Sequence, residues 1–181
     1  MPVNYAEAIK YYKLAAERSH TEAQFSLAFC CEKCKDVPVS QAEIAMYCKQ
    51  AADKGHAGAQ CYLGYCCEHG QGVALNYAEA VKYYKMAADQ GYISALLNLA
   101  LCYDYGRGVP VDRAAAANCY KLAADQGLAD AQYYLGLCYE DGRGVPVNYA
   151  EAVKYYKLAA DQGHALAKEK SKRMPSVFRA F

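Results

Sequence analysis

The sequence lacks the features of a membrane-spanning or nucleic-acid-binding protein. No apolar run reaches the roughly 18 residues that a membrane-spanning helix needs. The net charge is only +1, and residues 168–181 hold five basic residues against one acidic residue, a local charge of +4 that leaves −3 for the rest. A mildly acidic body offers no broad basic face to a phosphate backbone. We therefore expect no membrane span and no nucleic-acid partner.

The short motifs of common enzymes are missing as well. There is no Ser-x-x-Lys, the pair that supplies an acylating serine and its base, and no HExxH zinc motif. The segment GRGVPV at 106–111 and 142–147 resembles part of a dinucleotide-binding loop, but it lacks the third glycine and follows a predicted helix instead of a strand. We expect no catalytic residue, no cofactor and no enzymatic activity.

No apolar signal-peptide core occurs in the first twenty residues, which already carry the pattern described next. We expect a cytoplasmic protein. If the chain is a fragment of a longer one, secretion or delivery to a host cell is the alternative.

What the sequence does have is a repeat. Nearly the same segment occurs at 3–16 (VNYAEAIKYYKLAA), 75–93 (LNYAEAVKYYKMAADQGYI) and 147–165 (VNYAEAVKYYKLAADQGHA). Equivalent positions are 36 residues apart, as in Asn4, Ser40, Asn76, Asp112 and Asn148. Self-similarity at a fixed period of this length predicts a solenoid, in which each unit buries its apolar face against its neighbours.

Two helices are predicted in each repeat. The first is expected at 4–16, 40–52, 76–88, 112–124 and 148–160, beginning at an Asn, Ser or Asp cap and mostly followed by a glutamate three residues later. The second is expected at 22–31, 58–67, 94–103 and 130–139. A glycine after each complete first helix suits a left-handed C-terminal residue, at Gly55, Gly91, Gly127 and Gly163. Gly64 and Gly136 in the second helix leave room for a close neighbour.

The unit AQYYLGLCYEDGRGVPVNYAEAVKYYKLAADQG, residues 131–163, resembles the Sel-one-like repeat, a relative of the tetratricopeptide repeat. The matching positions are Ala131, Leu135, Gly136, Tyr139, Gly142, Gly144, Val145, Ala152, Tyr155, Tyr156, Ala159, Ala160 and Gly163. Family members often have Trp where this chain has Tyr155, and the chain has no Trp. The resemblance covers about residues 2–167. It implies an all-α fold, a right-handed solenoid of antiparallel helix pairs at 1–167, followed by a basic cap or tail at 168–181. It also implies an adaptor that holds protein complexes together.

A partner-binding groove is predicted along the second helices. Alignment with the tetratricopeptide pattern places Tyr133, Leu137 and Glu140 toward the concave side, because helical neighbours three and four apart share a face. The full set is Phe25, Phe29, Glu32, Cys61, Tyr65, Glu68, Leu97, Leu101, Asp104, Tyr133, Leu137 and Glu140. An apolar stripe edged by carboxylates suits an amphipathic helix or extended peptide with a basic flank. The alternative is that these apolar side chains only complete helix packing and that the acids are solvated.

The ten cysteines are interpreted mainly as small apolar residues. Cys30, Cys66, Cys102 and Cys138 are 36 apart, and like helices of neighbouring repeats lie roughly 8–10 Å apart, too far for a disulfide. Cys48 and Cys61 lie near facing positions on consecutive helices, so one isolated bridge stays open.

Two further hypotheses remain open. A thiol or zinc site could form from Cys31, Cys34 and His69. The alternative is that these are loop residues that differ between repeats without forming a site. The thiol or zinc site would accompany a different function, binding of a small molecule or cell-wall fragment with or without hydrolysis, as in a cysteine-rich branch of the family linked to penicillin binding. The opening helix could also expose some of Ala8, Tyr11, Tyr12 and Ala15 and pair with a second copy.

Overall fold

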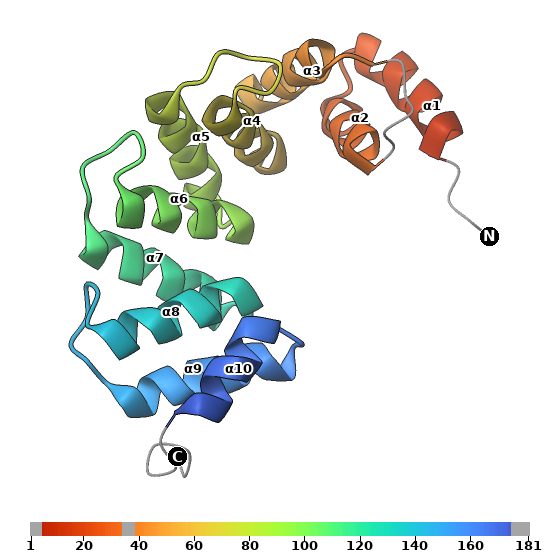
Figure 1. Cartoon of the computed structure of the whole chain (residues 1–181). Helices are drawn as coiled ribbons and strands as arrows, with labels where there is room; N and C mark the ends of the chain where they lie inside the picture. The colour runs from red at the N-terminus through yellow and green to blue at the C-terminus, as the bar shows by residue number, and fades with distance from the viewer. Residues whose placement is uncertain (1–4, 34–38, 175–181) are drawn as a thin grey trace. The chain divides into compact units, whose positions relative to one another are not determined.

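The computed structural model of the chain describes residues 5–33 and 39–174, which form helices without any strand (Figure 1). The first helices of the repeats, which we call A helices, are α1 (Tyr5–Glu17), α3 (Gln41–Asp53), α5 (Tyr77–Asp89), α7 (Arg113–Asp125) and α9 (Tyr149–Asp161). The second helices, the B helices, are α2 (Thr21–Lys33), α4 (Ala57–His69), α6 (Ile93–Tyr105), α8 (Ala129–Asp141) and α10 (Ala165–Arg173). The predicted helices are confirmed, with ends within two residues of those observed.

The predicted caps explain where the A helices begin. Asn76 Oδ1 accepts a hydrogen bond from the Glu79 amide at 3.1 Å, and Asn148 Oδ1 accepts one from the Glu151 amide at 3.1 Å. Such a bond satisfies one of the free amides of the first helical turn. Ser40 and Asp112 cap α3 and α7 in the same way.

Residues with positive φ end the A helices, as predicted. Gly55 and Gly163 have φ of 89° and 90°. In the first repeat this position is Ser19, which has a φ of 64°. Within the described ranges, Ser19 is the one residue other than glycine that has a positive φ. A side chain is disfavoured in this conformation, so the first repeat ends its A helix less favourably than the later repeats.

The chain divides into two compact units, Met1–Tyr92 and Ile93–Phe181. The first unit contains α1 to α5 and the second contains α6 to α10, and within each unit helices consecutive in the chain pack against each other (Figure 1). The predicted boundary between residues 167 and 168 falls inside α10.

Close packing of a B helix on the next A helix depends on glycine, as predicted. A Cβ at Gly64 would lie 2.8 Å from the ring of Tyr84, and a Cβ at Gly136 would lie 2.6 Å from the ring of Tyr156. Both rings are fully buried. The missing methyl group therefore lets a large aromatic side chain fill the helix interface.

The cysteines of the described residues are buried thiols, apart from the half-buried Cys119. Cys30, Cys66, Cys102 and Cys138 are all within the core, as expected for small apolar residues. Burial raises the pKa of the Cys138 thiol to about 11. Cys48 and Cys61 are both thiols, so the isolated bridge left open by the sequence is not formed.

No helix within residues 5–33 and 39–174 combines the length and the apolar character that crossing a membrane requires.

Candidate functional site

The predicted groove residues lie on the B helices, on α2 and α4 in the first unit and on α6 and α8 in the second. The side chain of Glu32 lies outside the described residues. We call the apolar members the B-helix stripe: Phe25, Phe29, Cys61 and Tyr65 in the first unit, and Leu97, Leu101, Tyr133 and Leu137 in the second. Phe29 is 50% exposed, Cys61 is buried, and the other six are half-buried.

Aromatic contacts organise the stripe in the first unit. The Phe25 ring lies 4.7 Å from the His56 ring, centroid to centroid. The Tyr65 ring lies 4.2 Å from that of His69 and 6.3 Å from that of Tyr62. These contacts hold the rings in place while leaving part of Phe25 and Tyr65 exposed. An ordered aromatic surface loses little side-chain entropy when a partner binds it.

In the second unit, aromatic contacts hold the ring of Tyr133 in place. Its ring is stacked on His164 with 4.6 Å between centroids, and it lies 5.9 Å from the ring of Tyr156. Tyr133 and Leu137 both pack against the core that α9 and α10 share. The half-buried faces of these side chains thus contribute to stability as well as to the surface.

Three carboxylates of the predicted groove, Glu68, Asp104 and Glu140, are turned toward the chain's own side chains. Glu68 accepts a hydrogen bond from the Tyr84 hydroxyl at 2.8 Å. Asp104 is buried and forms an ion pair with Arg143, with 3.0 Å between carboxylate oxygen and guanidinium nitrogen. This carboxylate balances a cation of the chain, so it does not require a basic partner.

Glu140 is held by two donors. It accepts hydrogen bonds from the Tyr156 hydroxyl and from Lys170 Nζ, the latter at 2.8 Å. Burial alone would raise the pKa of Glu140, but these two hydrogen bonds and the positive charges of Lys170 and Arg173 outweigh it and hold the pKa below its usual value. Glu140 is therefore a structural anion that fastens α10 to α8.

Tyr120 breaks this pattern. It occupies the repeat position of Tyr84 and Tyr156, but residue 104 is an aspartate where Glu68 and Glu140 stand, and Asp104 is bound to Arg143. The buried Tyr120 hydroxyl has no hydrogen-bond partner among the described residues. Asp104 is one methylene group shorter than the glutamates at the equivalent positions, and the tyrosine of this repeat is the one whose hydroxyl lacks a hydrogen bond within the described ranges.

A family model describes the repeats directly. The model, described as Sel1 repeat, matches residues 1–20, 21–56, 57–92, 93–128 and 129–164. The chain belongs to the Sel1 repeat family. The predicted resemblance and the 36-residue period are confirmed, and proteins of this family are generally protein-interaction scaffolds without enzymatic activity.

Two solved Sel1 repeat structures share the fold and 32% sequence identity with the chain. A Sel1 repeat protein from Oxalobacter formigenes superimposes with a TM-score of 0.82 over 90% of this chain and 65% of its own length. A protective antigen present in uropathogenic Escherichia coli strains, displaying an SLR fold, superimposes with a TM-score of 0.81 over 88% of this chain and 34% of its own length. The chain thus spans less than two thirds of either relative. Their similarity confirms the all-α solenoid of antiparallel helix pairs.

Helicobacter pylori cysteine rich protein B is more distant, with 21% identity and a TM-score of 0.56 over 71% of this chain, and it shows the fold alone. No curated protein matches the chain.

Two histidines have a structural role that the sequence did not reveal. His56 and His164 cap α4 and α10, because Nδ1 of each ring accepts the amide of Ala59 or Ala167 at 3.1 and 3.2 Å. The other ring nitrogen of His56 lies 3.0 Å from Glu22. The available signal was their separation from His20 by whole repeats, one for His56 and four for His164, but histidine is an uncommon cap.

The residues of the predicted thiol or zinc site are only partly described. Cys31 is buried, and His69 is exposed with Nδ1 3.0 Å from the Tyr65 carbonyl oxygen. Cys34 lies outside the described residues. Within the described part of the Sel1 repeats, no three Cys, His, Asp or Glu side chains gather as a metal site would require.

Proposed function

We propose that this chain is a protein-interaction scaffold that binds an amphipathic helix or an extended peptide of a partner protein along the B-helix stripe. The observation that carries the proposal is the partial exposure of apolar side chains along the B helices: Phe29 is 50% exposed, and six other members of the stripe are half-buried. Aromatic side chains held in place are typical anchors of protein interfaces. The family's general role as an interaction scaffold supports the same class of function.

The chemistry expected of the partner follows from the stripe. Apolar side chains spaced three or four apart on a partner helix would contact Phe25 and Phe29, or Leu97 and Leu101, which have the same spacing. Asp104 and Glu140 are already balanced by cations. We therefore expect apolar contacts to contribute more of the affinity than a basic flank does.

Affinity capture with matched variants tests the proposal. Phe29→Glu and Leu101→Glu place a charge on the stripe in each unit, while Met46→Glu and Leu122→Glu place the same charge on exposed A-helix positions, which are 47% and 55% exposed. Each chain is first checked for helicity and thermal unfolding. A partner retained by wild type and by the A-helix variant, but lost from the stripe variant, supports the proposal. Equal retention by both variants contradicts it.

We also propose that α1 contributes to self-association. Tyr11 and Leu14 on this helix are 61% and 50% exposed, while Ala8, Tyr12 and Ala15 are half-buried. Exposed large apolar side chains that lie together favour association. Light scattering over a range of concentrations tests this idea, with Tyr11→Glu as the comparison. A monomeric mass for wild type at the highest concentration contradicts it.

A further inference from the structure

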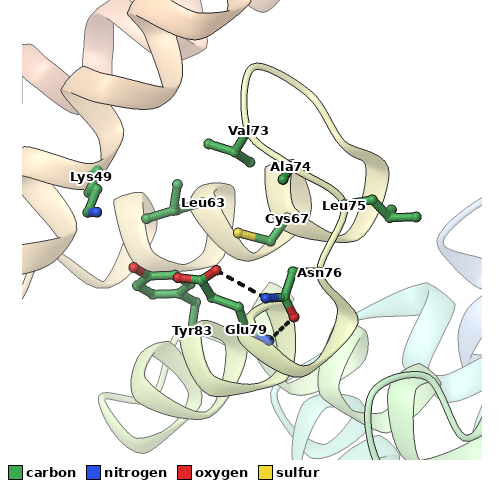
Figure 2. Close-up of a pocket in the computed structure, with 9 residues that line it drawn as sticks. All are labelled: Lys49, Leu63, Cys67, Val73, Ala74, Leu75, Asn76, Glu79 and Tyr83. Atoms are coloured by element: carbon green, nitrogen blue, oxygen red, sulfur yellow. Dashed lines mark hydrogen bonds between the residues drawn. The ribbon is translucent and has the colours of Figure 1, made fainter.

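A pocket of about 210 Å³ lies in the first unit, and its lining includes no residue of the B-helix stripe (Figure 2). Its walls come from α3, α4, α5 and the connection between α4 and α5. In Figure 2 the connection carries Val73 to Leu75 across from the α5 residues, with Leu63 and Cys67 of α4 between them. The lining residues are Lys49, Leu63, Cys67, Val73, Ala74, Leu75, Asn76, Glu79 and Tyr83.

The second unit contains the same backbone arrangement two repeats further along the chain. The Asn76 amide donates to the Cys67 carbonyl oxygen at 2.8 Å, and the Asn148 amide donates to the Tyr139 carbonyl oxygen at 2.9 Å. The helix-ending Gly70 and its equivalent have φ of 66° and 69°. The connections from α4 to α5 and from α8 to α9 therefore have the same backbone conformation and differ in their side chains.

The decisive difference is that Cys67 occupies the position of Tyr139. In the second unit the Tyr139 ring is stacked on Tyr155, with 5.9 Å between centroids and 7° between planes. In the first unit Tyr83 is the equivalent of Tyr155 and lines the pocket together with Cys67. Replacing a tyrosine by a cysteine removes an aromatic ring from this place, and Tyr83, on which such a ring would stack, lines the pocket.

We propose that this pocket binds a planar phenolic ring, stacked on Tyr83 as Tyr139 is stacked on Tyr155. The size is suitable, since an apolar cavity of about 150 Å³ is known to hold benzene. The lining also offers Lys49 as a donor and Glu79 as an acceptor for a ring hydroxyl. The chemistry is that of a para-substituted phenol, either a free small molecule or the tyrosine side chain of a peptide.

The thiol in this pocket suits a binding role better than a covalent one. Burial, with the negative charge of Glu79 nearby, raises the pKa of Cys67. A neutral thiol is a poor nucleophile and a good apolar neighbour for a ring. The occupant is thus expected to bind reversibly.

The test uses p-cresol with the whole chain, observed by NMR. The expected result is a set of intermolecular nuclear Overhauser effects from the cresol ring protons to the methyl groups of Leu63 and Val73. A dissociation constant of about 1 mM is reasonable for so small a ligand. Absence of these contacts at millimolar p-cresol would overturn the proposal.

Two variants make the result specific to the missing ring. Cys67→Tyr fills the pocket with the side chain that the second unit has, so the contacts to Leu63 and Val73 should disappear. Tyr139→Cys opens the equivalent space in the second unit, and p-cresol should raise its melting temperature more than that of wild type. If Cys67→Tyr does not fold, the Tyr139→Cys comparison decides the question, and an equal shift for Tyr139→Cys and wild type counts against the proposal.

A Gly-Gly-Tyr-Gly-Gly peptide distinguishes the two sources of the ring. Binding of both ligands supports a tyrosine side chain as occupant, and binding of p-cresol alone supports a free phenol. Binding of neither contradicts the proposal. Because the stripe variant Phe29→Glu changes none of the lining residues, it should bind p-cresol as wild type does.

Discussion

At the scale of single residues, the tyrosines that pack the A helices onto the B helices differ in one measurable respect. The hydroxyls of Tyr84 and Tyr156 donate to carboxylates, whereas the buried Tyr120 hydroxyl has no partner among the described residues. An unmet buried hydroxyl carries a desolvation penalty, while a hydrogen bond to a charged acceptor contributes to stability. The same substitution should therefore have different effects at equivalent positions.

Replacing each tyrosine by phenylalanine tests this difference. Tyr84→Phe and Tyr156→Phe should each lower the free energy of unfolding by about 1–2 kcal/mol, because each removes a hydrogen bond to a carboxylate. Tyr120→Phe should leave it unchanged or raise it by up to about 1 kcal/mol. Urea unfolding followed by circular dichroism measures all three. Equal losses at the three positions would show that Tyr120 has a partner after all.

Glu140 predicts how stability depends on pH. Because its pKa is lowered in the folded chain, its contribution is present above the pKa of the unfolded chain, about 4.3, and is lost as pH falls through the folded pKa. The melting temperature should therefore decrease below about pH 4, and this decrease should be smaller in Glu140→Gln. Lys170→Met removes the cation that lowers the pKa and should reduce the decrease as well. An acid dependence that is identical in all three chains contradicts this role.

At the scale of helices, the repeats differ in the residue that caps the start of the B helix. His56 and His164 accept first-turn amides of α4 and α10, but Leu128, at the same repeat position, begins α8 without any side-chain cap. Leu128→Asn should therefore raise the free energy of unfolding by about 0.5–1 kcal/mol, and His56→Ala should lower it by about 1 kcal/mol. Thermal and urea unfolding measure both changes. A loss in Leu128→Asn would mean that the apolar contacts of the half-buried leucine outweigh the cap.

Helices and their ends could be predicted from the sequence because they depend on local chemistry that recurs every 36 residues. Asn76 and Gly55 show this, since a cap and a left-handed glycine act within a few residues of themselves. The direction of Glu68 and Glu140 could not be predicted in this way. Their spacing on the helix is correct, but the groups that bind them come from the next A helix and, for Glu140, also from α10. Such contacts depend on how helices pack, which periodicity does not specify.

The pocket beside Cys67 was likewise not evident from the sequence. Cys67 repeats Cys31, and the cysteines are interpreted from the sequence mainly as small apolar residues. Its meaning depends on the comparison with Tyr139, whose ring is stacked on Tyr155 in the second unit. The predicted partner-binding residues remain a prediction, because surface exposure identifies where a partner could bind but not which one does.

At the scale of the whole molecule, the account divides the chain's side chains into two roles. Buried tyrosines, glycines and the carboxylates that accept hydrogen bonds from the tyrosines hold successive helices together, while the B-helix stripe is proposed to bind a partner. This division is typical of repeat proteins, in which each unit contacts mainly its neighbours and the remaining surface is available for binding. It predicts that a charge at the exposed Phe29 reduces binding with little loss of stability. Replacing the buried Tyr84 or Tyr156 should instead reduce stability without weakening binding.

The most direct test is the dissociation constant of the purified partner for three folded chains: wild type, Phe29→Glu with Leu101→Glu, and Met46→Glu with Leu122→Glu. Calorimetric titration should show at least tenfold weaker binding to the stripe variant, about 1.4 kcal/mol or more, and unchanged binding to the A-helix variant. If instead the A-helix variant loses affinity and the stripe variant keeps it, the partner binds the other face and the central claim is wrong.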